Sequence, residues 1–98
     1  MHNPTKRQEA QATVKQALIE AALLKTEVAV EALIPPWIAP NRHKAILAEV
    51  LSCARCDMER LTVVQLRNKG EINRPISNAI ATARSIVACN VATRRNLQ

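Results

Sequence analysis

The segment Ile34-Pro-Pro-Trp-Ile-Ala-Pro-Asn41 divides the chain, because it holds three of the five prolines and the only tryptophan. Pro35 and Pro36 remove two backbone donors and disfavour the α conformation at the residue before each of them. Asn41 follows Pro40 and has a side-chain oxygen suited to an N-cap. The segment therefore predicts that one helix ends at about residue 33 and that another begins at about residue 42.

The residues before this segment predict one long helix over residues 5–33, with Pro4 just ahead of it. Its apolar residues recur at intervals of three and four, which is the spacing of one helical face. Leu23 and Val30 widen this stripe beyond what two neighbouring helices need. We expect the helix either to break or to meet a partner or a second copy of the chain. The residues of the stripe are Val14, Leu18, Ala21, Leu24 and Val28.

A second break is predicted over residues 68–74, which contain the only glycine, Gly70, and are followed by Pro75. The segment 42–67 carries two adjoining apolar seams and is expected to be the central helix. Pro75 suits the first turn of a third helix over residues 75–93. The abundance of good helix formers favours helix over strand. The sequence therefore predicts an all-α fold with a single domain over residues 1–98. The expected arrangement is a three-helix antiparallel bundle, or a helical hairpin assembly, with a long N-terminal helix.

The composition excludes several classes of protein. Apolar residues make up 48% and charged residues 22%, which is a globular balance rather than a disordered one. A single aromatic residue argues against folds that stack nucleic-acid bases on aromatic side chains. Charges interrupt every apolar run before about 18 residues, and the polar start lacks a signal-peptide core, so no membrane contact is expected. Three cysteines, an odd number, favour free thiols in a reducing compartment, and we expect a cytoplasmic protein.

Positive charge is concentrated in the last third of the chain. The net charge is +6, yet residues 1–34 carry equal numbers of basic and acidic side chains, whereas residues 72–98 carry four arginines and no Asp or Glu. A surface of this kind attracts polyanions, and nucleic acid leads the candidates. A solvated face, or a face that pairs with an acidic protein, is the alternative. The candidate phosphate-binding residues are Arg67, Lys69, Arg74, Arg84, Arg94 and Arg95.

Residues 62–81 resemble a degenerate helix-turn-helix, the motif that places its second helix in the major groove of DNA. In this resemblance Gly70 supplies the turn and the second helix is pinned inward by Ile76, Ala79 and Ile80. Charged residues flank Gly70 where the motif has apolar ones, and an ordinary helix-loop-helix hairpin explains the same pattern. The resemblance implies that four side chains of the second helix face DNA: Ser77, Asn78, Thr82 and Arg84.

Metal binding and catalysis find little support in the sequence. Cys53 and Cys56 form a CxxC pair that, with Cys89 and His43, makes four zinc-type ligands. The pair lies in the middle of an expected helix and no second pair follows, so we expect small packed residues and no metal. No Gly-rich phosphate loop or nucleophile–base pair is present, so we expect no enzyme and no cofactor.

Trp37 is the one large side chain of the proline-rich segment. It either caps the end of the helices or stands out as an anchor for a partner protein. Together with Leu23 and Val30 of the wide stripe, it forms the candidate partner-binding set.

The sequence thus predicts a small, non-enzymatic, cytoplasmic regulatory protein with a basic C-terminal helix. Its expected partner is nucleic acid, with duplex DNA preferred, or a protein complex bound to nucleic acid. The alternative is a protein-binding adaptor or inhibitor that acts through its first helix and Trp37. Both are typical of small phage-like or plasmid-like proteins, although no motif assigns a family. A homodimer is one way to cover the wide stripe.

Overall fold

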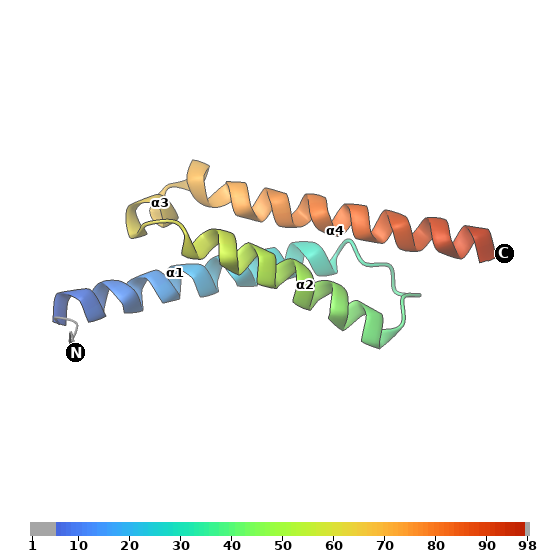
Figure 1. The fold of residues 1–98 in the computed structure, drawn as a ribbon, viewed down its shortest axis with the longest axis horizontal. Helices are drawn as coiled ribbons and strands as arrows, with labels where there is room; N and C mark the ends of the chain where they lie inside the picture. Colours follow the sequence, from blue (N-terminus) through green and yellow to red (C-terminus); the bar gives the residue numbers. More distant parts are fainter. Residues whose placement is uncertain (1–5, 98) are drawn as a thin grey trace.

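The computed structural model describes residues 6–97, and the side chains of residues 6–93. The described chain forms four helices and no strand: α1 (Lys6–Glu31), α2 (Pro40–Glu59), α3 (Val63–Arg67) and α4 (Lys69–Leu97). The predicted all-α class is confirmed, but the predicted number of three helices is wrong. α2 runs in the opposite direction to α1 and α4, and α3 lies at the end where α4 begins (Figure 1). Within residues 6–97, no helix has the length and apolar content that crossing a membrane requires.

The proline-rich segment separates α1 from α2 as predicted. α1 ends at Glu31, and Ala32 N still donates to Val28 O (3.2 Å). The two amides after Ala32 make the tighter bonds of a narrowing turn, from Leu33 N to Val30 O (3.0 Å) and from Ile34 N to Glu31 O (3.2 Å). The expected N-cap at Asn41 is wrong. α2 begins at Pro40, two residues before the predicted start, with Ala39 at the N-cap and no side chain that caps it. Proline suits this position because the first turn of a helix has no use for its amide hydrogen.

The predicted helix over residues 42–67 is interrupted at residues 60–62. Thr62 begins a capping box, a reciprocal pair of bonds that starts a new helix. Its side chain accepts from Gln65 N (3.2 Å), and Gln65 Oε1 accepts from Thr62 N (2.9 Å). These bonds satisfy amides that α3 would otherwise leave open, so the chain turns here although the apolar pattern runs on.

The second break was predicted over residues 68–74, but in the structure only Asn68 separates α3 from α4. Asn68 N donates to Gln65 O (3.0 Å) at the end of α3, and Asn68 Oδ1 accepts from Gly70 N (2.9 Å) at the start of α4. Gly70 lies in the first turn of α4 and has no positive φ. Pro75 lies inside α4 and is buried, so the predicted start of the third helix at residue 75 is wrong. The proline removes one bond, the one that the Glu71 carbonyl would accept.

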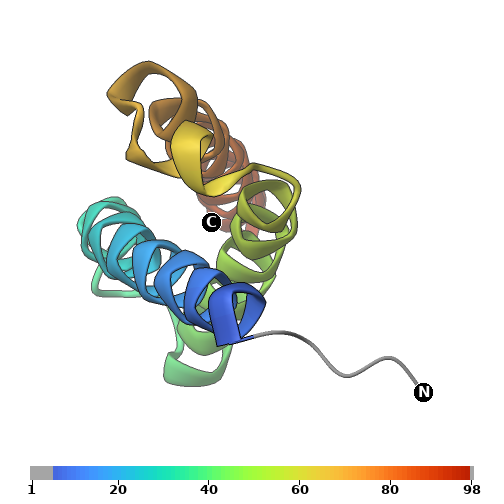
Figure 2. The same cartoon turned by 90° about the vertical axis from the view of Figure 1, so that its left-hand side faces the viewer.

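The core lies where α1, α2 and α4 pack against one another, with α3 closing the end between α1 and α4 (Figure 2). α2 supplies its centre through four buried residues, and α4 contributes two buried alanines. Leu23 and Val30 of α1, which were predicted to bind a partner, are 7% and 0% exposed because they point into this core. The buried residues of the four helices are Ile19, Ala22, Leu23, Thr26, Val30, Ile46, Val50, Ala54, Met58, Leu66, Pro75, Ala79 and Ala83.

The molecule is elongated, measuring 60 × 30 × 18 Å. At about 1.5 Å per residue, α1 and α4 are roughly 39 and 44 Å long, whereas α2 is roughly 30 Å long. Since α2 is the shortest of the three, the first turns of α1 and the last turns of α4 project past it at opposite ends (Figure 1).

Candidate binding surfaces

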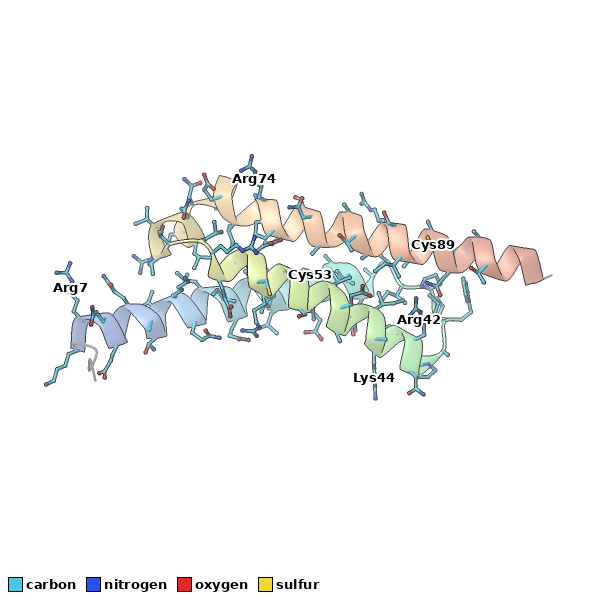
Figure 3. All side chains as sticks on the ribbon, in the orientation of Figure 1. Arg7, Arg42, Lys44, Cys53, Arg74 and Cys89 are labelled. Carbon is cyan, nitrogen blue, oxygen red and sulfur yellow. The ribbon has the colours of Figure 1, made fainter. Side chains whose placement is uncertain are left out.

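The basic side chains of α3 and α4 lie on the outside of the molecule. Arg67, Lys69, Arg74 and Arg84 are all exposed, and Arg74 points away from the neighbouring helices (Figure 3). Ser77, Asn78 and Thr82 are exposed on the same helix. Arg74 and Arg84 are ten residues apart on α4, about 15 Å at the rise of an α-helix. We call Arg67, Lys69, Arg74 and Arg84 the basic surface. Within it, Arg67 and Lys69 lie on the side of the α3–α4 corner that faces α1, and Arg74 lies on the side that faces the end of α2.

The ion pairs between described residues lie outside the basic surface. Arg55 Nη2 is 2.7 Å from Glu20 Oε1, and His43 Nε2 is 3.9 Å from Glu31 Oε1. No residue of the basic surface forms an ion pair within the described part of the chain. The side chains of Arg94 and Arg95, which were predicted to extend this surface, lie outside the described residues.

The Glu20–Arg55 pair joins α1 to α2. Its hydrogen bond lowers the pKa of the Glu20 carboxyl below its usual value, against a smaller opposing effect of desolvation, and Gln16 Nε2 also donates to Glu20 Oε1 (3.0 Å). One acidic side chain of α1 thus has a partner within the chain, whereas Arg67, Lys69, Arg74 and Arg84 form no ion pair with any described residue.

Two carboxylates lie near one end of the basic surface. Asp57 and Glu71 line a hollow of about 260 Å³ together with Arg60 and Arg74. Two negative and two positive charges balance there, so Arg74 contributes less field than its exposure suggests. Glu71 is one of the charged residues that flank Gly70, and it lowers the positive potential at this end of the basic surface.

The resemblance to a helix-turn-helix fails at its turn. Gly70 lies within α4, α3 has only five residues, and Asn68 alone separates the two helices. The side-chain orientations agree better with the prediction: Ala79 is buried, Ile76 and Ile80 are half-buried, and Ser77, Asn78, Thr82 and Arg84 are exposed. α4 therefore keeps an outward polar face without the turn that defines the motif.

An apolar groove with basic sides runs between α1 and the α3–α4 corner. It comprises two hollows of about 400 Å³ each, and Arg67 lines both of them. Its lining includes four basic residues, Arg7, Lys25, Arg67 and Lys69, and no carboxylate among the described residues. The α1 side consists of Arg7, Ala10, Gln11, Val14, Leu18, Ala21, Ala22 and Lys25, and the opposite side of Val63, Val64, Leu66, Arg67, Lys69, Ile72, Asn73 and Ile76. We call this the basic groove.

Several apolar side chains remain at the surface. Trp37 is 43% exposed, and Leu24 and Val28 of α1 are 64% and 69% exposed. Val64, in the wall of the basic groove, is 79% exposed. The wide stripe of α1 thus supplies both core residues and surface residues.

The cysteines do not form a cluster. Cys53 and Cys56 of α2 and Cys89 of α4 are exposed free thiols, so the prediction that they are packed residues is wrong. Figure 3 shows Cys53 and Cys89 well separated along the molecule. Among the residues that the structure describes, no three His, Cys, Asp or Glu side chains come close enough to hold a metal ion.

With respect to known proteins, no family model, no curated protein and no solved structure matches this chain.

Proposed function

We propose that this chain is a small, non-enzymatic, cytoplasmic regulator that binds nucleic acid, duplex DNA in the first place, through the basic surface. The observation that carries the proposal is that Arg67, Lys69, Arg74 and Arg84 are exposed and that none forms an ion pair within the described residues. Unpaired guanidinium and ammonium groups release counterions from a phosphate backbone when they bind it, which is the main source of affinity in such contacts.

The shape of α4 supports this mode of binding. It is long, it lies along one edge of the molecule, and its last turns project beyond α2, so a rod-like polyanion can approach it (Figure 1). Ser77 and Asn78 add a hydroxyl and an amide beside Arg74, and such groups commonly bond to phosphate oxygens. Arg94 and Arg95 would continue the contact toward the C-terminus. Contacts to phosphate position a protein on a duplex but do not distinguish one base from another, so the expected binding is largely independent of base sequence.

The double substitution Arg74→Ala and Arg84→Ala is expected to flatten the salt dependence of duplex binding. Each lost phosphate contact lowers the slope of log K against log salt by about 0.9, so the slope should fall by about 2. The measurement is a fluorescence-anisotropy titration of a labelled duplex at several salt concentrations. Arg42→Ala with Lys44→Ala removes the same charge from the start of α2, where Lys44 points away from α4, and serves as the matched control (Figure 3). A control that flattens the slope equally, or a parent protein that binds no duplex at low salt, would refute the proposal.

The basic groove favours a second candidate function, that of an adaptor or inhibitor that binds a protein through α1. Leu23 and Val30 are not available for this role, because they lie in the core. The groove offers instead an apolar floor with Arg7 and Lys25 at its two ends, about 27 Å apart along α1. An amphipathic helix that presents an apolar stripe flanked by carboxylates complements both features.

Val64→Glu is expected to weaken binding of such a helix at least tenfold, because it places a carboxylate in the groove wall against carboxylates of the ligand. The probe is a labelled 18-residue peptide with Leu at every third or fourth position and Glu elsewhere, titrated by anisotropy. Ala45→Glu adds the same charge to an exposed position of α2 and should leave binding unchanged. Equal binding of a peptide with Lys in place of Glu would remove this candidate.

A further inference from the structure

α1 carries a second apolar stripe that points away from the core. Its residues alternate at spacings of four and three along the helix, which is the heptad pattern of a coiled coil. Leu24 and Val28 are 64% and 69% exposed, Ala10, Ala17 and Ala21 are exposed, and Val14 is half-buried. The stripe, which we call the α1 seam, consists of Ala10, Val14, Ala17, Ala21, Leu24 and Val28.

The α1 seam and the core occupy opposite sides of the helix. At about 100° per residue, the midpoint of the seam lies roughly 180° from the midpoint of the buried residues Ile19, Leu23, Thr26 and Val30. The seam is flanked by the other helices: Ala10, Val14 and Ala21 line hollows shared with α3 and α4, and Leu24 lines one shared with α2. A second helix along the seam therefore also covers these hollows. Leu24 and Val28 leave most of their side chains exposed in the single chain, and exposed Leu and Val at heptad spacing are typical of a helix interface.

We propose that α1 forms a parallel, two-stranded coiled coil with α1 of a second copy of this chain. In heptad terms Val14, Ala21 and Val28 occupy a positions, and Ala10, Ala17 and Leu24 occupy d positions. Two of the three a positions are β-branched and the last d position is leucine, which is the combination that favours parallel dimers. The alanines bury little area, so the association depends on protein concentration.

The charges beside the seam complement each other in the parallel orientation. Glu20 occupies a g position and Lys25 the e position five residues later, so Glu20 of each copy faces Lys25 of the partner subunit. Within the chain, Arg55 and Gln16 both donate to Oε1 of Glu20, which leaves Oε2 to accept from that lysine. An antiparallel pairing of the same stripe places g positions opposite g positions and brings the two Glu20 carboxylates together.

This dimer has consequences for both candidate functions and depends on neither. Two copies of the basic surface on one particle raise the avidity for a long polyanion. Ala10, Val14 and Ala21 belong to the seam and also line the basic groove, so a second copy and a groove-bound helix compete for α1.

The oligomeric state is measured by sedimentation velocity over a range of protein concentrations without any ligand. The parent should pass from monomer to dimer as concentration rises, and Leu24→Glu and Val28→Glu should each weaken self-association at least tenfold. Ala45→Glu is the control, since it places the same carboxylate at an exposed position of α2 outside the seam and outside the basic groove, and it should dimerise like the parent. Circular dichroism checks that all variants keep the parent helix content, which is expected because both seam positions are exposed.

Orientation is tested by disulfide trapping with Cys53, Cys56 and Cys89 replaced by serine. In the parallel dimer, Val28→Cys should cross-link to its own symmetry mate on oxidation. In an antiparallel dimer only a mixture of Ala10→Cys and Val28→Cys chains should cross-link, and that result would overturn the proposed orientation. A parent that stays monomeric at every concentration, or a dimer indifferent to both seam substitutions, would overturn the interface itself.

Discussion

Replacing Ile46 with alanine is expected to lower the free energy of unfolding by about 2–5 kcal/mol. Ile46 is 0% exposed and lies in α2, the helix that contacts both α1 and α4, so the lost side chain leaves a cavity where three helices meet. A domain of this size has a total stability of roughly 5–15 kcal/mol, so the substitution removes a large share of it. The measurement is urea unfolding followed by helical circular dichroism.

Val64→Ala is the control for this substitution, because Val64 is also β-branched and is 79% exposed. It should change the stability by no more than about 0.5 kcal/mol. If Ile46→Ala costs less than about 1 kcal/mol, the neighbouring helices close over the gap easily, and the core does not have the packing described above.

The proline-rich segment and the helix class could be predicted because local chemistry decides them. Two adjacent prolines stop a helix whatever surrounds them, and the predicted range 5–33 agrees with Lys6–Glu31 within two residues at the C-terminal end. The α2–α3 break could not be found from apolar periodicity, because the pattern of Met58, Leu61 and Val64 continues through it. The signal that marks it is the pair Thr62 and Gln65, a capping box that the periodicity conceals.

Gly70 and Pro75 led to the wrong predicted start of α4, because glycine and proline usually interrupt a helix. Asn68 already ends α3 and caps the Gly70 amide, so no separate turn is needed at the glycine. Pro75 is buried, and its packing offsets a single lost hydrogen bond. Tertiary contacts therefore outweighed local preference at both positions.

The candidate surfaces depend on information that one sequence does not contain. The exposed cations of α3 and α4 could be predicted from a charge count. The basic groove could not, since it joins residues 7–25 to residues 63–76, and only the fold places these segments together. The wide stripe of α1 likewise combines two faces, and periodicity alone cannot tell that Leu23 points into the core while Leu24 points out.

Ala83→Leu is expected to destabilise the fold by about 1–3 kcal/mol, because it overpacks the core instead of leaving a cavity. Ala83 is 0% exposed and Ala79, one turn before it, is 4% exposed, so the core has room for only a methyl group at each of these two positions. A leucine there must push α4 away from the core or adopt a strained rotamer. Ala81→Leu, on the exposed face of the same helix, makes the same change with similar helix propensity and should stay within about 0.5 kcal/mol of the parent. Urea unfolding measures the free energy of unfolding of both variants. Equal values would show that α4 is not held against the core at Ala83. The basic residues that α4 carries would then lack the rigid support on which their geometry depends.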